Sequence, residues 1–264
     1  TDSNYFGYNI DQSGGQAPRD MDITVSPINV DEVHIAGVLT YRSMDGGVSF
    51  EQSSEWIPGE AESMGIGYCH ADVDILVFEG STLYVGSDGG IFKTEDSTNL
   101  IAGYYTDITK GLGINQLYKI GISQTADVVI SGGSQDNGTA SYNSTYGWRD
   151  WIGADGMETF IDKDNSDRMY GTSQYGQLYR SWNGGITLTQ LNEPGSGQGN
   201  WVTPWEQDPV ELNTSYLGYS TVYKSTSGGN SWNPASQSLG GNLDELKIAQ
   251  NNNQVLYASR GSIL

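Results

Sequence analysis

A strand that ends in small residues recurs six times along this chain, and this repeat constrains the fold more than any other feature. The intervals between the last residues of consecutive copies are 49, 46, 40, 46 and 41 residues. The six copies are Ile35-Ala36-Gly37, Tyr84-Val85-Gly86, Ile130-Ser131-Gly132, Tyr170-Gly171-Thr172, Tyr216-Leu217-Gly218 and Tyr257-Ala258-Ser259. Such spacing is typical of the four-stranded blades of a β-propeller.

Composition supports the same fold class. The chain has 36 Gly, 17 Tyr and 7 Trp among 264 residues, and its apolar runs are short. Turn-forming glycines combined with strand-favouring aromatics indicate many short strands joined by tight turns. The sequence therefore predicts an all-β fold.

The repeat predicts five complete blades and part of a sixth. We expect them at about residues 21–56, 72–110, 117–152, 157–192, 201–236 and 243–264, in one propeller region spanning 1–264. Residues 1–20 are expected to be an N-terminal extension or the end of a preceding blade. Because closed propellers leave only short, protected edges, we expect the chain to be part of a longer, larger propeller.

Within each blade we expect four strands, A to D, numbered outward from the propeller axis. The strands predicted for the first blade are 22–26, 32–37, 39–43 and 48–52. In such an up-and-down sheet, the A–B and C–D turns lie at one end of the blade. The B–C turns and the D-to-A crossovers lie at the other end, where propellers usually bind ligands.

The net charge of the chain argues against some classes of partner. Lys and Arg total 12 against 32 Asp and Glu, a formal charge of −20, which repels nucleic acid and anionic lipid. The acidic surplus is foremost a solvated surface, although it could also hold calcium. One cysteine, Cys69, permits no disulfide within the chain, and no apolar run is long enough to insert into a membrane.

The most specific motif lies between the predicted C and D strands. Residues 43–50 read Ser-Met-Asp-Gly-Gly-Val-Ser-Phe, and residues 181–188 and 225–232 follow the same pattern of Ser, a polar residue, Gly and Ser or Thr. Glycine supplies the positive φ of such a turn, and the Asp or Asn side chain can accept bonds from nearby amides. We therefore interpret these turns, with Asp45 and Asn183, as structural.

These three motifs resemble the Asp-box, or BNR, repeat of sialidases, sortilin-like receptors and xyloglucanase-type glycoside hydrolases. Four further stretches, 70–72, 86–93, 132–139 and 153–158, resemble large secreted bacterial propellers that often carry a type IX sorting domain. The resemblance implies a β-propeller at the cell surface or outside the cell. Sialidase chemistry needs an arginine triad and a tyrosine nucleophile, but no Arg-Ile-Pro motif occurs, and Arg42 and Arg180 precede two of the three motifs instead.

Polar and aromatic residues gather in the predicted B–C turns and crossovers. We expect them to converge on one mouth and to bind a ligand there. His70 with Asp72 could be a proton-transfer or metal pair, although a structural role for the histidine is the commoner case. The candidate binding residues are His70, Asp72, Gln135, Asp155, Gln174, Tyr175 and Trp201.

Two aspartates are candidates for catalysis. Asp88, in Asp88-Gly89-Gly90, partly resembles a catalytic turn of xyloglucanase-type enzymes, and Asp136 or Asp155 could be the second acid. A glycosidase needs its two carboxyl groups about 5–5.5 Å apart for retention or about 6.5–9.5 Å apart for inversion. Aspartates beside glycines are more often turn caps.

The sequence therefore favours a noncatalytic module that binds protein or glycan. A xyloglucanase-type hydrolase acting on polysaccharide is the alternative.

Overall fold

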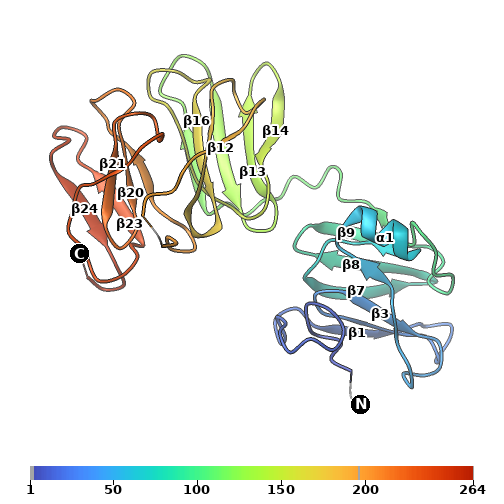
Figure 1. The fold of residues 1–264 in the computed structure, drawn as a ribbon. Helices are drawn as coiled ribbons and strands as arrows, with labels where there is room; N and C mark the ends of the chain where they lie inside the picture. The colour runs from blue at the N-terminus through green and yellow to red at the C-terminus, as the bar shows by residue number, and fades with distance from the viewer. Residues whose placement is uncertain (1–2, 196, 264) are drawn as a thin grey trace. The chain divides into compact units, whose positions relative to one another are not determined.

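The computed structural model describes residues 3–195 and 197–263 and divides into two compact units. Unit 1 spans Thr1–Gly113 and unit 2 spans Ile114–Leu264. Each unit consists of antiparallel four-stranded sheets in which consecutive strands are neighbours (Figure 1). These sheets are the predicted propeller blades, five of them complete, followed by two strands of a sixth.

Unit 1 holds the first two blades. The first blade contains β1 (Asp22–Val25), β2 (Val33–Ala36), β3 (Thr40–Ser43) and β4 (Glu51–Gln52). The second contains β7 (Val73–Glu79), β8 (Thr82–Ser87), β9 (Gly90–Thr94) and β10 (Thr106–Asp107).

Unit 2 holds the next three blades and the two-stranded sheet. The third blade contains β11 (Lys119–Ile122), β12 (Val129–Ser134), β13 (Gly138–Asn143) and β14 (Gly147–Ile152). The fourth contains β15 (Gly156–Ile161), β16 (Met169–Ser173), β17 (Gln177–Ser181) and β18 (Thr189–Gln190), with the 3-10 turn η1 (Gln174–Gly176) between β16 and β17. The remaining strands are β19 (Trp205–Gln207), β20 (Ser215–Gly218), β21 (Val222–Ser225) and β22 (Asn233–Pro234), then β23 (Glu245–Ile248) and β24 (Leu256–Ser259).

The crossover from the first to the second blade contains the helix α1 (Pro58–Met64) and a short parallel pair that the sequence analysis did not predict. The pair joins β5 (Ser54–Glu55) to β6 (Gly67–Tyr68). The helix starts with a proline in its first turn and ends at Gly65, whose φ of +71° is the left-handed conformation that glycine adopts readily. No helix among the described residues is long and apolar enough to cross a membrane.

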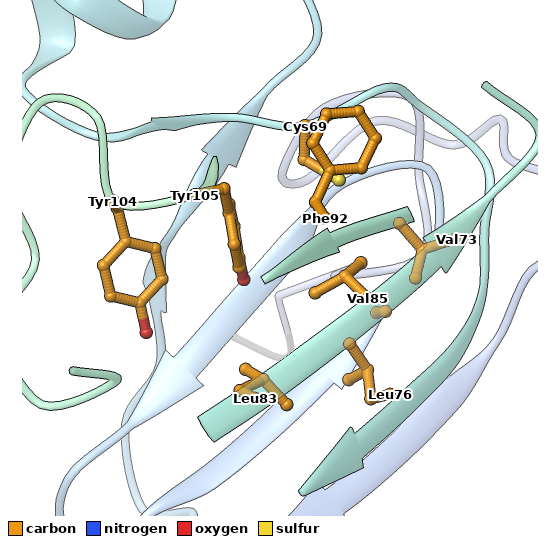
Figure 2. Packing of buried hydrophobic residues seen from close by; sticks show 9 residues of the cluster. Cys69, Val73, Leu76, Leu83, Val85, Phe92, Tyr104 and Tyr105 are labelled. Carbon is orange, nitrogen blue, oxygen red and sulfur yellow. The ribbon is translucent and has the colours of Figure 1, made fainter. Parts of the chain in front are cut away.

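The larger core cluster of unit 1 is formed by β7, β8 and β9 with side chains from the segments before β7 and after β9 (Figure 2). Tyr104 and Tyr105 follow β9, and their rings meet edge to face with centroids 4.7 Å apart. The buried thiol of Cys69 is free, and burial raises its pKa well above the usual range. The aliphatic and aromatic side chains that fill this core are Val73, Leu76, Leu83, Val85 and Phe92.

The N-terminal segment packs against the first blade. The Tyr5 ring lies 5.1 Å from Tyr41 and 5.3 Å from Phe50, measured between centroids. Gly7 and Gly15 form an isolated antiparallel bridge, which folds this segment back on itself.

The three motifs between C and D strands, here called the box turns (43–50, 181–188 and 225–232), share one hydrogen-bond pattern. In the first, the Gly47 amide donates to Ser43 Oγ at 2.9 Å, and the Ser49 amide donates to Asp45 Oδ1 at 2.9 Å. The Ser49 hydroxyl, the Ser49 amide and the Ser43 hydroxyl all donate to the Asp45 carboxylate, and these bonds lower the pKa of Asp45 to about 2. Equivalent bonds form in the other two turns through Ser181 and Asn183 and through Ser225 and Ser227.

Each box turn also bonds to the A–B turn of its own blade. The Gly46 amide donates to the Asp31 carbonyl, the Gly184 amide to that of Asp167, and the Gly228 amide to that of Asn213. The box turns therefore lie at the blade end that the topology predicted for them. The predicted D strand of the first blade, 48–52, is shorter in the structure because Val48–Phe50 belong to the box turn.

Candidate functional site

Unit 2 joins three of the predicted site residues from blade to blade. Asp136 lies in the turn between β12 and β13, and its amide donates to Asp155 Oδ1 at 2.9 Å. Asp155 precedes β15, and its own amide donates to Gln174 Oε1 at 3.3 Å. The Asp155 carboxylate and the Gln174 amide group thus hold the turns of two blades and the crossover between them in register.

Beside this chain of bonds lies a group of aromatic and amide side chains, here called the platform: Tyr118, Gln135, Tyr175 and Trp201. The Tyr175 and Trp201 rings meet edge to face with centroids 5.1 Å apart, and the Tyr175 amide donates to the Trp201 carbonyl. Trp201 Nε1 donates to Tyr118 Oη at 3.1 Å, and that hydroxyl donates in turn to Gln135 Oε1. Loops from three blades are thereby fixed to one another.

The platform is open to solvent although its members are mutually bonded. Tyr118 is 41% exposed and Tyr175 is 43% exposed, while Trp201 is half-buried. Aromatic rings fixed in this way present a stiff amphipathic surface, and little conformational entropy is lost when a ligand covers them.

Backbone strain is concentrated in the same loops. Asp136, Ala154 and Tyr175 have φ angles of +61°, +59° and +61°. Aspartate tolerates the left-handed region, but alanine and tyrosine do not favour it, and each such residue costs about 1–3 kcal/mol. Strain of this kind is typical of sites where a side chain must be presented in one orientation.

Unit 1 places His70, Asp72 and Asp88 together at the corresponding end of its blades. His70 Nδ1 lies 3.1 Å from the Ala71 carbonyl oxygen, and its ring packs under Gly89, where a Cβ would come within 2.1 Å of His70 Cγ. The Asp88 amide donates to the Asp72 carbonyl, and carboxylate oxygens of the two aspartates lie within 4.8 Å of each other.

The N-terminal segment supplies polar partners to these aspartates. Gln16 Nε2 donates to Asp72 Oδ1 at 2.6 Å, and Arg19 Nη2 lies 3.2 Å from both carboxylate oxygens of Asp88. Burial raises the pKa of Asp72, and the charge of Asp88 raises it further, against the lowering effect of the Gln16 bond. The positive charge beside the Asp88 carboxylate is thus a guanidinium of the chain itself.

Asp20 adds a third acid to this group in unit 1. Its side chain is fully buried, and Arg19 Nε lies 3.4 Å from Oδ1. Within the described part of the chain, neither carboxylate oxygen of Asp20 accepts a hydrogen bond. Burial, helped by the charge of Asp72, raises the pKa of Asp20 to about 6.

The two candidate catalytic acids fall in different units. Asp88 belongs to unit 1 and Asp136 to unit 2. That these two acids form a retaining or an inverting pair therefore stays a prediction. Asp155, the other candidate for the second acid, uses a carboxylate oxygen to hold the Asp136 turn.

Four residues of these sites were not among the predicted ones. Tyr118 ends the crossover into β11, so the reasoning that singled out Trp201 in the crossover before β19 applies to it equally. Gln16, Arg19 and Asp20 lie in the N-terminal segment, where no repeat pattern indicates which loops they contact.

No protein-family model matches the chain, and no curated protein resembles it in sequence. Among solved structures, it is similar to YCF48 from Cyanidioschyzon merolae, with 12% identity over 92% of this chain and 65% of that one and a TM-score of 0.29. It is also similar to YCF48 bound to D1 peptide, with 14% identity over 83% of this chain and 69% of that one and a TM-score of 0.37. The GH74 xyloglucanase from Xanthomonas campestris shows 14% identity over 89% of this chain and 43% of its own, with a TM-score of 0.38.

The chain spans less than two thirds of the first YCF48 structure and less than half of the xyloglucanase. Sequence identity at this level does not transfer residue roles, so the function is inferred from this chain's own side chains.

Proposed function

We propose that this chain is a noncatalytic binding module and that the platform of unit 2 holds a glycan. The observation that carries the proposal is the fixed pair of Tyr175 and Trp201 beside the Tyr118 hydroxyl and the Gln135 amide. Aromatic faces suit the apolar faces of sugar rings, and hydroxyl and amide groups suit sugar hydroxyls. The strained backbone of Tyr175 supports the same role.

The setting is proposed on the sequence resemblance. The box turns follow the Asp-box pattern, and the other matched stretches resemble secreted bacterial propellers with type IX sorting domains. We place the module outside the cell or at its surface, within a longer chain, and without nucleic-acid or membrane-inserted partners.

A glycan array followed by isothermal titration calorimetry tests the proposal. We expect Trp201→Ala to weaken binding at least tenfold, which is about 1.4 kcal/mol, a usual cost for removing a central aromatic. Tyr175→Gly is the sharper variant, because it removes the ring while relieving the positive φ. Its melting temperature should stay within a few degrees of the parent while its affinity falls.

Trp148→Ala, in the exposed outer strand β14, is the matched control and should bind glycan normally. The proposal is overturned if no glycan binds, or if both platform variants bind as tightly as the parent. Repeating the titration with calcium and with a chelator shows whether the cation contributes.

Hydrolysis is the alternative. Xyloglucan and related polysaccharides are incubated with the protein, and new reducing ends are measured. Release of reducing ends that is lost in Asp88→Asn or Asp136→Asn would replace the binding module with a glycoside hydrolase. We expect no release.

A further inference from the structure

The outermost strand of the third blade differs from its counterparts. β14 runs for six residues, Gly147–Ile152, and pairs only with β13 among the described strands. The outermost strands of the other complete blades, β4, β10, β18 and β22, have two residues each. An outermost strand has an unpaired edge, and proteins usually keep such edges short. β14 instead offers a long row of backbone groups at the rim of unit 2 (Figure 1).

Side chains along β14 form a defined surface beside this edge. Trp148 is 63% exposed and Tyr146, in the preceding turn, is 58% exposed. Asp150 is exposed and, by strand alternation, lies on the same face as Trp148. The Trp148 ring is supported across the strand pair by Tyr142, with ring centroids 5.5 Å apart.

The usable edge has a defined end. The pairing of β13 with β14 shifts between Thr139, opposite Ile152, and Ala140, opposite Asp150, so Trp151 is an extra residue. Trp151 turns inward, 6% exposed, and its Nε1 donates to Ser131 Oγ at 3.2 Å. A bulge of this kind ends regular pairing, which leaves Gly147–Asp150 as the regular part of the edge.

Charge indicates the chemistry of an occupant. Asp150 and Arg149 are the charged residues of β14, and the Arg149 guanidinium lies over the Tyr146 ring, 4.8 Å from its centroid. Trp148 can therefore offer its ring to a further cation beside the Asp150 carboxylate. The whole chain carries a formal charge of −20, which attracts basic segments and opposes pairing with a second copy.

We propose that the free edge of β14 receives an extended basic segment of a partner protein as a fifth strand of the third blade. Backbone hydrogen bonds to Gly147–Asp150 hold the segment, as in other cases of strand addition. Alternate Lys or Arg side chains lie over Trp148 and beside Asp150. This surface lies on the outer strand of its blade and is distinct from the platform.

The test uses the full chain and a synthetic probe, a blocked hexapeptide of alternating Lys and Thr. We expect the peptide to bind by calorimetry and to slow hydrogen exchange at the β14 amides. The same peptide with alternate backbone amides methylated, and a Glu-Thr peptide, should bind at least tenfold more weakly. Equal binding of the basic and acidic peptides, or no binding of either, overturns the proposal.

Variants separate this surface from others. Trp148→Ala should weaken binding of the Lys-Thr peptide at least tenfold, and Asp150→Asn about threefold with a weaker salt dependence. Two control variants should bind the Lys-Thr peptide as tightly as the parent does. They are Tyr257→Ala in β24, where the ring is 55% exposed, and Trp201→Ala in the platform. Because Trp148 is exposed, its loss should change the melting temperature little, and circular dichroism verifies the fold.

Three further results would overturn the proposal. One is peptide binding unaffected by Trp148→Ala, and another is protection of amides outside the third blade without protection of β14. In the last, the peptide fails to bind, and Trp148→Ala instead abolishes a concentration-dependent dimer or a glycan complex.

Discussion

Glu158 lies on β15 and is 7% exposed. The lysines that act on it electrostatically are already engaged, since Lys119 Nζ lies 2.5 Å from Glu245 Oε1 and Lys247 pairs with Glu206. Burial therefore dominates and raises the pKa of Glu158 to about 7, the two lysines opposing this shift and Glu206 adding to it. A buried acid with this pKa binds its proton more tightly in the folded chain than in the unfolded one.

Stability linked to Glu158 should fall as pH rises. The contribution is complete below the unfolded pKa of about 4.5 and is lost as pH rises through the folded pKa of about 7. We expect Glu158→Gln to remove this dependence and to be more stable than the parent at pH 8 by on the order of 3 kcal/mol. Urea unfolding followed by tryptophan fluorescence measures it, since six of the seven tryptophans lie in unit 2.

The comparison at two pH values is its own control. At pH 4.5 the glutamate is neutral, so the two proteins should differ far less there than at pH 8. Asp20, with its pKa raised to about 6, adds a slope of the same sign in both proteins and cancels from the difference. A constant difference at both pH values would show that Glu158 is not titrating as described.

At the scale of the strand, close approach between blades depends on small residues. Gly133 on β12 faces β15, and a Cβ at this position would lie 2.1 Å from the Met157 carbonyl oxygen and 2.7 Å from the Gly156 carbonyl carbon. Backbone atoms cannot yield as a flexible side chain can. Gly133 directly follows the recurring triplet that ends at Gly132, so a small residue at this end of β12 has a packing cause in this blade pair.

Gly133→Ala should separate β12 from β15 and lower the free energy of unfolding by about 2–3 kcal/mol. Gly153→Ala is the matched control, because nothing lies within 4 Å of its added Cβ, and it should change stability by less than about 0.5 kcal/mol. Urea denaturation measures both. Similar losses of stability in the two variants would mean that the close contact with β15 is not the reason for a glycine at position 133.

Sequence reasoning identified the strands and box turns because their signals are local. Alternation, small residues and glycine-rich turns recur within each blade, so the strands predicted at 22–26, 32–37 and 39–43 match β1, β2 and β3 to within one residue at each end. The fifth blade, predicted from about residue 201, has its first strand only from Trp205. The helix α1 carried its own signal, a proline in its first turn and a terminal glycine, but the repeat assigned no element to that crossover.

Contacts between loops were harder to predict from the sequence. The fixing of Trp201 by Tyr118 joins residues 83 apart in the chain, and the pairing of Arg19 with Asp88 joins residues 69 apart. No local pattern encodes such a pair, since each partner is an ordinary polar or aromatic residue in its own loop.

The whole molecule carries 32 acids against 12 Lys and Arg. Repulsion among these charges opposes the compact state and acts over distances that salt controls. Raising the ionic strength from about 0.01 M to about 0.15 M shortens the screening length from about 30 Å to about 8 Å. Attractive pairs such as Lys119 with Glu245 are weakened too, but the acid surplus makes repulsion the larger effect.

We therefore expect the melting temperature to rise by about 2–4 °C over this range of salt, as about 1 kcal/mol would produce in a chain of this size. Differential scanning calorimetry in sodium chloride measures the rise. Potassium chloride at equal ionic strength should give the same result, which distinguishes screening from binding of a particular ion. A fall in melting temperature would show that ion pairs outweigh repulsion.

The box turns have a consequence for how the chain folds. Each is closed by hydrogen bonds between residues no more than four positions apart, so its formation needs no distant part of the chain. Such contacts have minimal loop-closure entropy and form on the microsecond timescale of hairpins. The outer hairpin of a blade can thus assemble as soon as its strands leave the ribosome, before the next blade has been synthesised.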